Sequence, residues 1–145
     1  ACVRSDRAAR ARAAELLSHV GLEAYLSAEA DSLPYGALKR LEIARALACE
    51  PRLLLLDEPA AGCNARETSE IDALIKKVAA TGVTVVLVEH DMRLVMGISD
   101  HILVLDYGRK LAEGTADEVR ENPEVIAAYL GKGAAAARRA GPGRG

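Results

Sequence analysis

The sequence has few aromatic residues: of Phe, Trp and Tyr it contains only Tyr, at four positions. A core built without Phe or Trp is aliphatic, which suits a parallel α/β sheet covered by helices. Cysteine is also scarce, and the three present (Cys2, Cys49 and Cys63) are an odd number in no metal-ligand spacing. A reduced, cytosolic compartment is therefore favoured over a disulfide framework.

An excess of positive charge and long apolar runs are missing as well. The chain has 19 Lys and Arg against 21 Asp and Glu, a net charge of -2 and a pI of about 6.0, which gives no case for a nucleic-acid partner. No apolar run approaches the roughly 18 residues that span a bilayer. There is no signal-peptide pattern, and the missing initial Met leads us to expect that the chain begins inside a longer protein.

Hydrophobic periodicity and turn residues predict helices alternating with short strands. Helices are predicted over residues 7–21, 38–48, 65–79 and 116–121, and a last one from Pro123 to Gly131. Strands are predicted over 53–56, 83–88 and 101–105, with 109–113 as a hairpin return. The uniformly apolar strands predict a sheet buried on both faces. Residues 132–145 form a low-complexity tail that is predicted to be disordered.

Polar side chains follow two of the predicted strands where each strand ends. The strand, helix and strand from Leu53 to Val88 form a βαβ unit, so Asp57 and Glu58 should lie at the same sheet edge as Glu89 and His90. Ligands of open α/β sheets bind at that edge. One carboxylate there can hold hydrated Mg²⁺ and its neighbour can deprotonate a water that attacks a phosphate. The simpler alternative is that Asp57 and Glu58 only begin a loop and cap a helix.

Several segments resemble the motifs of ABC-type ATPases, in that family's order. LPYGALKRLEIARALA resembles the signature motif and its helix, LLLLDEP the Walker B segment, and VVLVEHD the switch-histidine segment. LPYG in place of LSGG, together with EHDMRLVMGISD, LDYGRKLAEGT and ENPEVIAAYLG, is similar to the ATP-binding subunits of branched-chain amino acid importers. The resemblance extends over residues 7–131.

The resemblance implies a partial P-loop NTPase (RecA-like) domain, α/β with mainly parallel strands and part of the helical signature subdomain. Residues 1–131 would be the C-terminal part of an ABC nucleotide-binding domain, with the signature region at about 7–50 and the Walker B to C-terminal elements at 51–131. It also implies ATP and Mg²⁺ as ligands. The partners would be a second nucleotide-binding subunit and membrane permease subunits, at the cytoplasmic face of the membrane. Such a subunit would power transport by ATP-driven dimerisation.

Residue roles follow from the same resemblance. Asp57 would hold Mg²⁺ through water, Glu58 would be the general base and His90 the γ-phosphate switch residue. The signature residues would contact the ATP of the opposite subunit; they are Leu33, Pro34, Tyr35, Gly36 and Ala37. A free helix start at Tyr35 suits such an anion. The D-loop residues would be Ala61, Gly62, Cys63 and Asn64.

The sequence departs from the family pattern at three places. Pro34 stands where the family usually has Ser, and Ala37 where it has Gln or Glu, which removes polar groups near the opposite subunit's phosphate. The phosphate loop G-x-x-x-x-G-K-[ST] occurs nowhere. We therefore expect a fragment that is inactive in isolation and hydrolyses ATP only in the full-length chain. The alternatives are a non-hydrolysing interaction or regulatory module, or an ABC protein of DNA repair or translation.

The missing segment also predicts an incomplete sheet. In the family, the strand leading into the phosphate loop lies between the strands that correspond to 83–88 and 101–105. We therefore expect 53–56 to pair parallel with 83–88, while 101–105 is separated by a gap or pairs in another way.

Overall fold

The computed structural model describes residues 2–130 and divides them into two compact units, the first ending at Glu89 and the second beginning at His90. The prediction that residues 132–145 are disordered lies outside the described residues, as does the predicted end of the last helix at Gly131. Among the described residues, none of the helices is both long enough and apolar enough to cross a bilayer.

The first unit begins with helices. They are α1 (Cys2–His19), two 3-10 turns (Glu23–Tyr25 and Ala30–Ser32) and α2 (Tyr35–Leu47). Helix α2 starts three residues earlier than the predicted 38, because Pro34 sets the helix start: its carbonyl accepts hydrogen bonds from the N–H groups of Ala37 (2.9 Å) and Leu38 (3.0 Å). Gly21, with φ of 71°, follows the end of α1.

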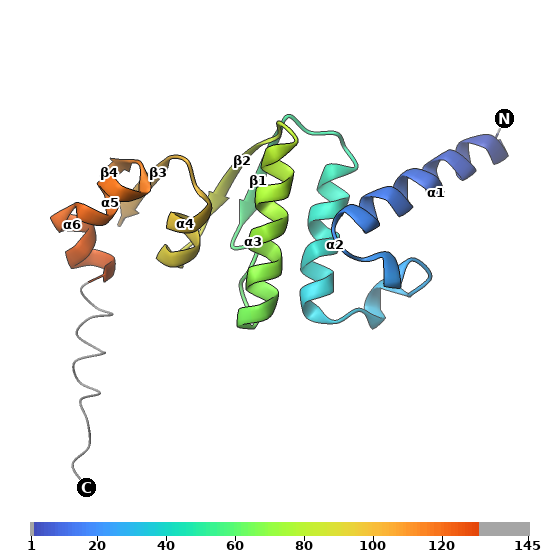
Figure 1. Ribbon diagram of the computed structural model, residues 1–145, viewed down its shortest axis with the longest axis horizontal. Helices are drawn as coiled ribbons and strands as arrows, with labels where there is room; N and C mark the ends of the chain where they lie inside the picture. Colours follow the sequence, from blue (N-terminus) through green and yellow to red (C-terminus); the bar gives the residue numbers. More distant parts are fainter. Residues whose placement is uncertain (1, 131–145) are drawn as a thin grey trace, which may run out of the picture. The chain divides into compact units, whose positions relative to one another are not determined.

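A parallel βαβ unit follows, as predicted. Strands β1 (Leu53–Asp57) and β2 (Thr84–Val88) pair in parallel, with Leu53 opposite Thr84 and Asp57 opposite Val88. Between them α3 (Ala65–Ala80) lies beside α2 and against β2 (Figure 1). Its buried stripe consists of the predicted residues Ile71, Leu74, Ile75 and Val78.

Asn64 caps α3 as predicted, and does so through a complete capping box. Its side-chain oxygen accepts hydrogen bonds from the N–H groups of Arg66 and Glu67, both at 3.0 Å. The Glu67 carboxylate accepts one from the Asn64 N–H at 2.9 Å. Three N–H groups at the helix start are thereby bonded, which fixes where the preceding loop ends.

The prediction that the first two strands are buried on both faces is wrong. Along β1, Leu54 is buried, whereas Leu53 and Leu55 are 51% and 68% exposed; on β2, Val86 and Val88 are 48% and 59% exposed. Successive side chains of a strand point to opposite faces, and in the described residues helices cover only one of them. The other face is left apolar and open.

The second unit is built on a hairpin. Its elements are α4 (Met92–Ile98), β3 (Ile102–Asp106), β4 (Arg109–Gly114), α5 (Ala116–Glu121), α6 (Pro123–Val125) and a π-helical turn (Ile126–Leu130). Tyr107 and Gly108 both have positive φ, as two-residue hairpin turns require. The predicted cap Thr115 starts α5, where Glu118 completes a second capping box.

The pairing of β3 confirms the prediction of an incomplete sheet. β3 pairs antiparallel with β4 in a two-stranded sheet of its own, and β1 and β2 form the other. Helix α4 was not predicted; its cap is Asp91, whose carboxylate accepts hydrogen bonds from the N–H groups of Arg93 and Leu94. The core of this unit is aliphatic, as the composition predicted, and consists of Ile102, Val104, Val119 and Val125.

Candidate functional site

The two carboxylates of the predicted site lie where β1 ends. Asp57 is the last residue of β1, and the next residue, Glu58, donates its backbone N–H to the carbonyl of Val88 at 2.9 Å. Both side chains are exposed. Glu58 has a φ of 44°, in the left-handed region that costs a non-glycine residue about 1–3 kcal/mol. This turn takes the chain out of the strand direction directly at the predicted general base.

The predicted D-loop, from Ala61 to Asn64, is a compact run of turns. The N–H of Ala61 bonds to the carbonyl of Glu58 at 3.0 Å, and the N–H of Cys63 to that of Ala60 at 3.1 Å. Gly62 has a φ of 79°, a conformation that glycine adopts at no steric cost. A short loop of defined shape therefore connects Glu58 to Asn64, the residue that caps α3.

The structure brings the predicted signature residues and the D-loop together. Tyr35, the first residue of α2, donates its hydroxyl hydrogen to the carbonyl of Ala61 at 3.0 Å. Gly36 and Ala37 are buried, Leu33 is partly buried, and Pro34 is exposed. A side chain at Gly36 would meet the Glu67 carboxylate, since an added Cβ would lie 2.7 Å from it. These contacts were not predicted from the sequence. The signal for them was Tyr35, which stands where LSGG has a glycine.

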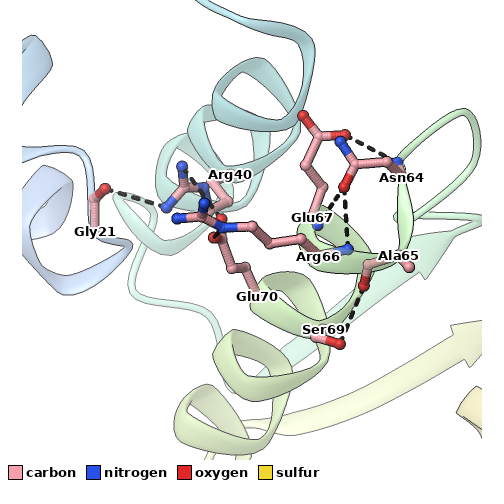
Figure 2. Close-up of polar contacts among 8 residues, drawn as sticks. All are labelled: Gly21, Arg40, Asn64, Ala65, Arg66, Glu67, Ser69 and Glu70. Carbon is pink, nitrogen blue, oxygen red and sulfur yellow. Dashed lines mark hydrogen bonds and ion pairs between the residues drawn. The ribbon is translucent and has the colours of Figure 1, made fainter.

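Two arginines face the carboxylate of Glu70 (Figure 2). Arg40 of α2 donates to the carbonyl of Gly21 at 3.2 Å and lies 3.7 Å from the carboxylate of Glu70. Arg66 donates to the same carboxylate at 3.0 Å, but it lies on α3 itself, one turn before Glu70. The ion pair between Arg40 and Glu70 is therefore the one that joins α2 to α3 beside the predicted signature.

Two cavities border these segments. One of about 470 Å³ lies between the starts of α2 and α3, and Arg40, Arg66 and Glu70 form its charged wall. The other, of about 200 Å³, is lined by Lys39, Glu42, Ile43, Leu55, Leu56, Asp57 and Pro59. Its lining is thus partly charged and partly apolar, and it lies at the carboxyl end of β1, where ligands of α/β folds bind.

The side chain of Cys63 in the D-loop is partly exposed. Its pKa is raised, chiefly because burial disfavours the thiolate and further because the Glu67 carboxylate is near; Lys39 acts in the opposite direction. A raised pKa makes a thiol less reactive as a nucleophile at neutral pH.

His90 is the first residue of the second unit and is exposed. Asp57 and Glu58 belong to the first unit, so the expected position of His90 beside them remains a prediction.

A magnesium site would depend on the nucleotide as well as on the protein. Within the part of the chain that the structure describes, no three His, Cys, Asp or Glu side chains are grouped to hold a metal. Mg²⁺ in nucleotide sites is held by one or two carboxylates together with phosphates and water. Asp57, with a single exposed carboxylate at the strand end, fits that arrangement, whereas a metal cage of protein ligands does not.

The fold is that of an ABC-type ATP-binding cassette, a P-loop NTPase. A crystal structure of the ADP conformation of an ATP-binding cassette of an ABC transporter matches with a TM-score of 0.75 and 30% identity, over 83% of this chain and 49% of that one. CbiO1 from Clostridium perfringens, part of an ABC transporter complex, matches with a TM-score of 0.74 and 32% identity, over 84% and 49%.

The sequence comparisons agree with the structural ones. The ABC transporter profile matches residues 2–61, and that of the branched-chain amino acid ATP-binding cassette transporter matches residues 109–135. The chain belongs to the ATP-binding domains of ABC transporters.

The curated relatives name a solute. The high-affinity branched-chain amino acid transport ATP-binding protein BraF of Pseudomonas aeruginosa is 52% identical over 130 residues, which are 89% of this chain and 51% of that protein. LivG of Escherichia coli, of the same description, is 48% identical over the same shares. The chain thus spans about half the length of the curated relatives it matches.

Proposed function

We propose that this chain is part of an ATP-binding subunit in an importer of branched-chain amino acids. This part would supply the residues that hydrolyse ATP and those that contact the ATP of the opposite subunit. The observation that carries the proposal is the carboxylate pair at the end of β1, where a backbone bond to Val88 of β2 fixes Glu58 and its left-handed backbone turns the chain away from the strand. The identity of about half to the branched-chain amino acid relatives supports the choice of solute over methionine, for which a relative is 42% identical over 118 residues.

Each predicted residue has a chemical task in this proposal. Asp57 would hold Mg²⁺ through water, and the ion would stabilise the negative charge of the phosphates. Glu58 would accept the proton of the attacking water, and His90 would donate a hydrogen bond to the γ-phosphate as charge builds there. The signature and D-loop residues would face the ATP of a second subunit. The subunit pair would act on permease subunits at the cytoplasmic face of the membrane.

A complementation experiment tests the proposed function. A complete cassette is made by joining this chain to the part of the Pseudomonas aeruginosa relative that the match does not cover. We expect this cassette to restore uptake of labelled leucine in cells that lack the relative, because the permease would receive a working ATPase. Uptake of labelled methionine is the control and should not change. A cassette that hydrolyses ATP in solution but restores no leucine uptake would contradict the proposed solute.

The residues given contain no G-x-x-x-x-G-K-[ST] pattern. In P-loop NTPases that pattern supplies the nest of backbone N–H groups and the lysine that bind the phosphates.

We expect the chain by itself to bind Mg-ATP no tighter than roughly 1 mM, that is about -4 kcal/mol, because Asp57 and Glu58 provide no cradle for the phosphates. Isothermal titration calorimetry measures this. A micromolar dissociation constant would show that the phosphates bind elsewhere on this chain. It would contradict the assumption that tight phosphate binding needs the loop G-x-x-x-x-G-K-[ST].

A further inference from the structure

Tyr35 connects the signature segment to the D-loop through both its hydroxyl and its ring. The hydroxyl donates to the carbonyl of Ala61 at 3.0 Å. The ring lies against Gly62: a Cβ added there would be 3.2 Å from the ring edge and from the hydroxyl oxygen. Lys39, one turn along α2, places its ammonium 5.7 Å from the ring centroid. The ring is therefore held by a hydrogen bond, a backbone contact and a cation–π interaction.

A second contact joins the same two segments. Gly36 leaves room for the Glu67 side chain, whose carboxylate accepts the N–H of Asn64 at 2.9 Å. Adjacent residues of α2 thus lie at opposite ends of the D-loop: Tyr35 bonds to Ala61, and Gly36 adjoins Glu67, whose carboxylate bonds to Asn64. The loop spans these two fixed points with only Gly62 and Cys63 between them.

We propose that Tyr35 is a positioning residue that fixes the D-loop to the signature helix, so that both segments meet the opposite subunit's nucleotide as one surface. The inference rests on the proposed function, because it assumes that both segments act across a subunit pair. The physical reason is that the hydroxyl-to-carbonyl bond fastens Ala61 directly to α2, whereas the backbone bonds of Ala61 to Glu58 and of Cys63 to Ala60 are turns within the segment. In this scheme Tyr35 acts through Ala61.

The variant Tyr35→Phe in the complete cassette tests the inference, because it removes the hydroxyl and keeps the ring. We expect kcat for ATP hydrolysis to fall two- to tenfold, the range that corresponds to a net hydrogen bond, with KM for ATP unchanged. Hydrogen exchange of the backbone amides in residues 58–64, measured by mass spectrometry, should become faster in the same variant.

The matched control is Tyr129→Phe, which removes a hydroxyl bond of the same kind, from Tyr129 to the carbonyl of Leu105 in the second unit. It should leave both kcat and the exchange of residues 58–64 as in the wild type. If Tyr35→Phe behaves like this control in either measurement, or raises KM with kcat unchanged, the positioning role is wrong. Failure of the proposed function would look different: the unsubstituted cassette would lack hydrolysis, while the exchange measurement would still report whether Tyr35 restrains the loop.

Discussion

In the complete cassette, Glu58→Gln is expected to lower steady-state ATP turnover by about 10²- to 10⁴-fold, the usual contribution of a positioned general base. The amide keeps the size and shape of the carboxylate but cannot accept the proton of the attacking water. ATP binding and ATP-driven dimerisation should persist, because neither requires that proton transfer. Phosphate release measures turnover, and sedimentation with Mg-ATP measures dimerisation.

The chain offers a close control for this substitution in Glu50. Glu50 is also an exposed glutamate in a left-handed conformation, with φ of 49° against 44° for Glu58. It pairs with Arg12 at 3.4 Å, outside the predicted site. Glu50→Gln should therefore leave turnover unchanged, which separates the chemistry of the carboxylate from any cost of changing a residue in strained backbone. Near-normal turnover of the Glu58→Gln cassette would refute the assignment of Glu58 as the base.

The sequence predicted those parts of the fold whose signals are local. The stripe from Ile71 to Val78 gave α3, and Asn64 and Thr115 marked two helix starts, because capping uses residues only three positions apart. The parallel pairing of β1 with β2 followed from the helix predicted between them, which makes the segment a βαβ unit. The separation of β3 followed from the family resemblance, since nothing within residues 101–105 distinguishes them from another buried strand.

Features that depend on distant packing could not be predicted in this way. The contact between Tyr35 and Ala61 joins residues 26 positions apart, and it forms only because α2 and the D-loop lie side by side. The left-handed backbone of Glu58 could not be predicted from its residue type, because glutamate rarely adopts that conformation. The composition of a strand does not report which layers are present, so apolar residues alone could not indicate which face of β1 and β2 is open.

That open face leads to the second large effect, self-association of the chain in isolation. Leu55 and Val86 are cross-strand partners, and both are exposed on the face of β1 and β2 opposite α3. Burying a fully exposed side chain of this kind contributes about 1.5–3 kcal/mol, and covering the exposed part of Leu55 and Val86 contributes a share of that, which favours contact with a second copy or with misfolded chain. We expect the purified chain to sediment as oligomers or aggregates, with a weak near-UV tyrosine signal and no sharp thermal transition.

The double variant Leu55→Glu with Val86→Lys should shift the chain toward monomer, because it places an opposite-charge pair on the open face. The control is Leu26→Glu with Tyr107→Lys, which also replaces two exposed large side chains, 49% and 99% exposed, neither of them on β1 or β2. The control adds the same two charges and should sediment like the wild type, since the strand face remains apolar. A wild-type chain that is monomeric and unfolds in one sharp transition would contradict the expectation. It would mean that the aliphatic core beneath α3 is sufficient for a stable fold, and it would favour the interaction module over the part of a larger ATPase.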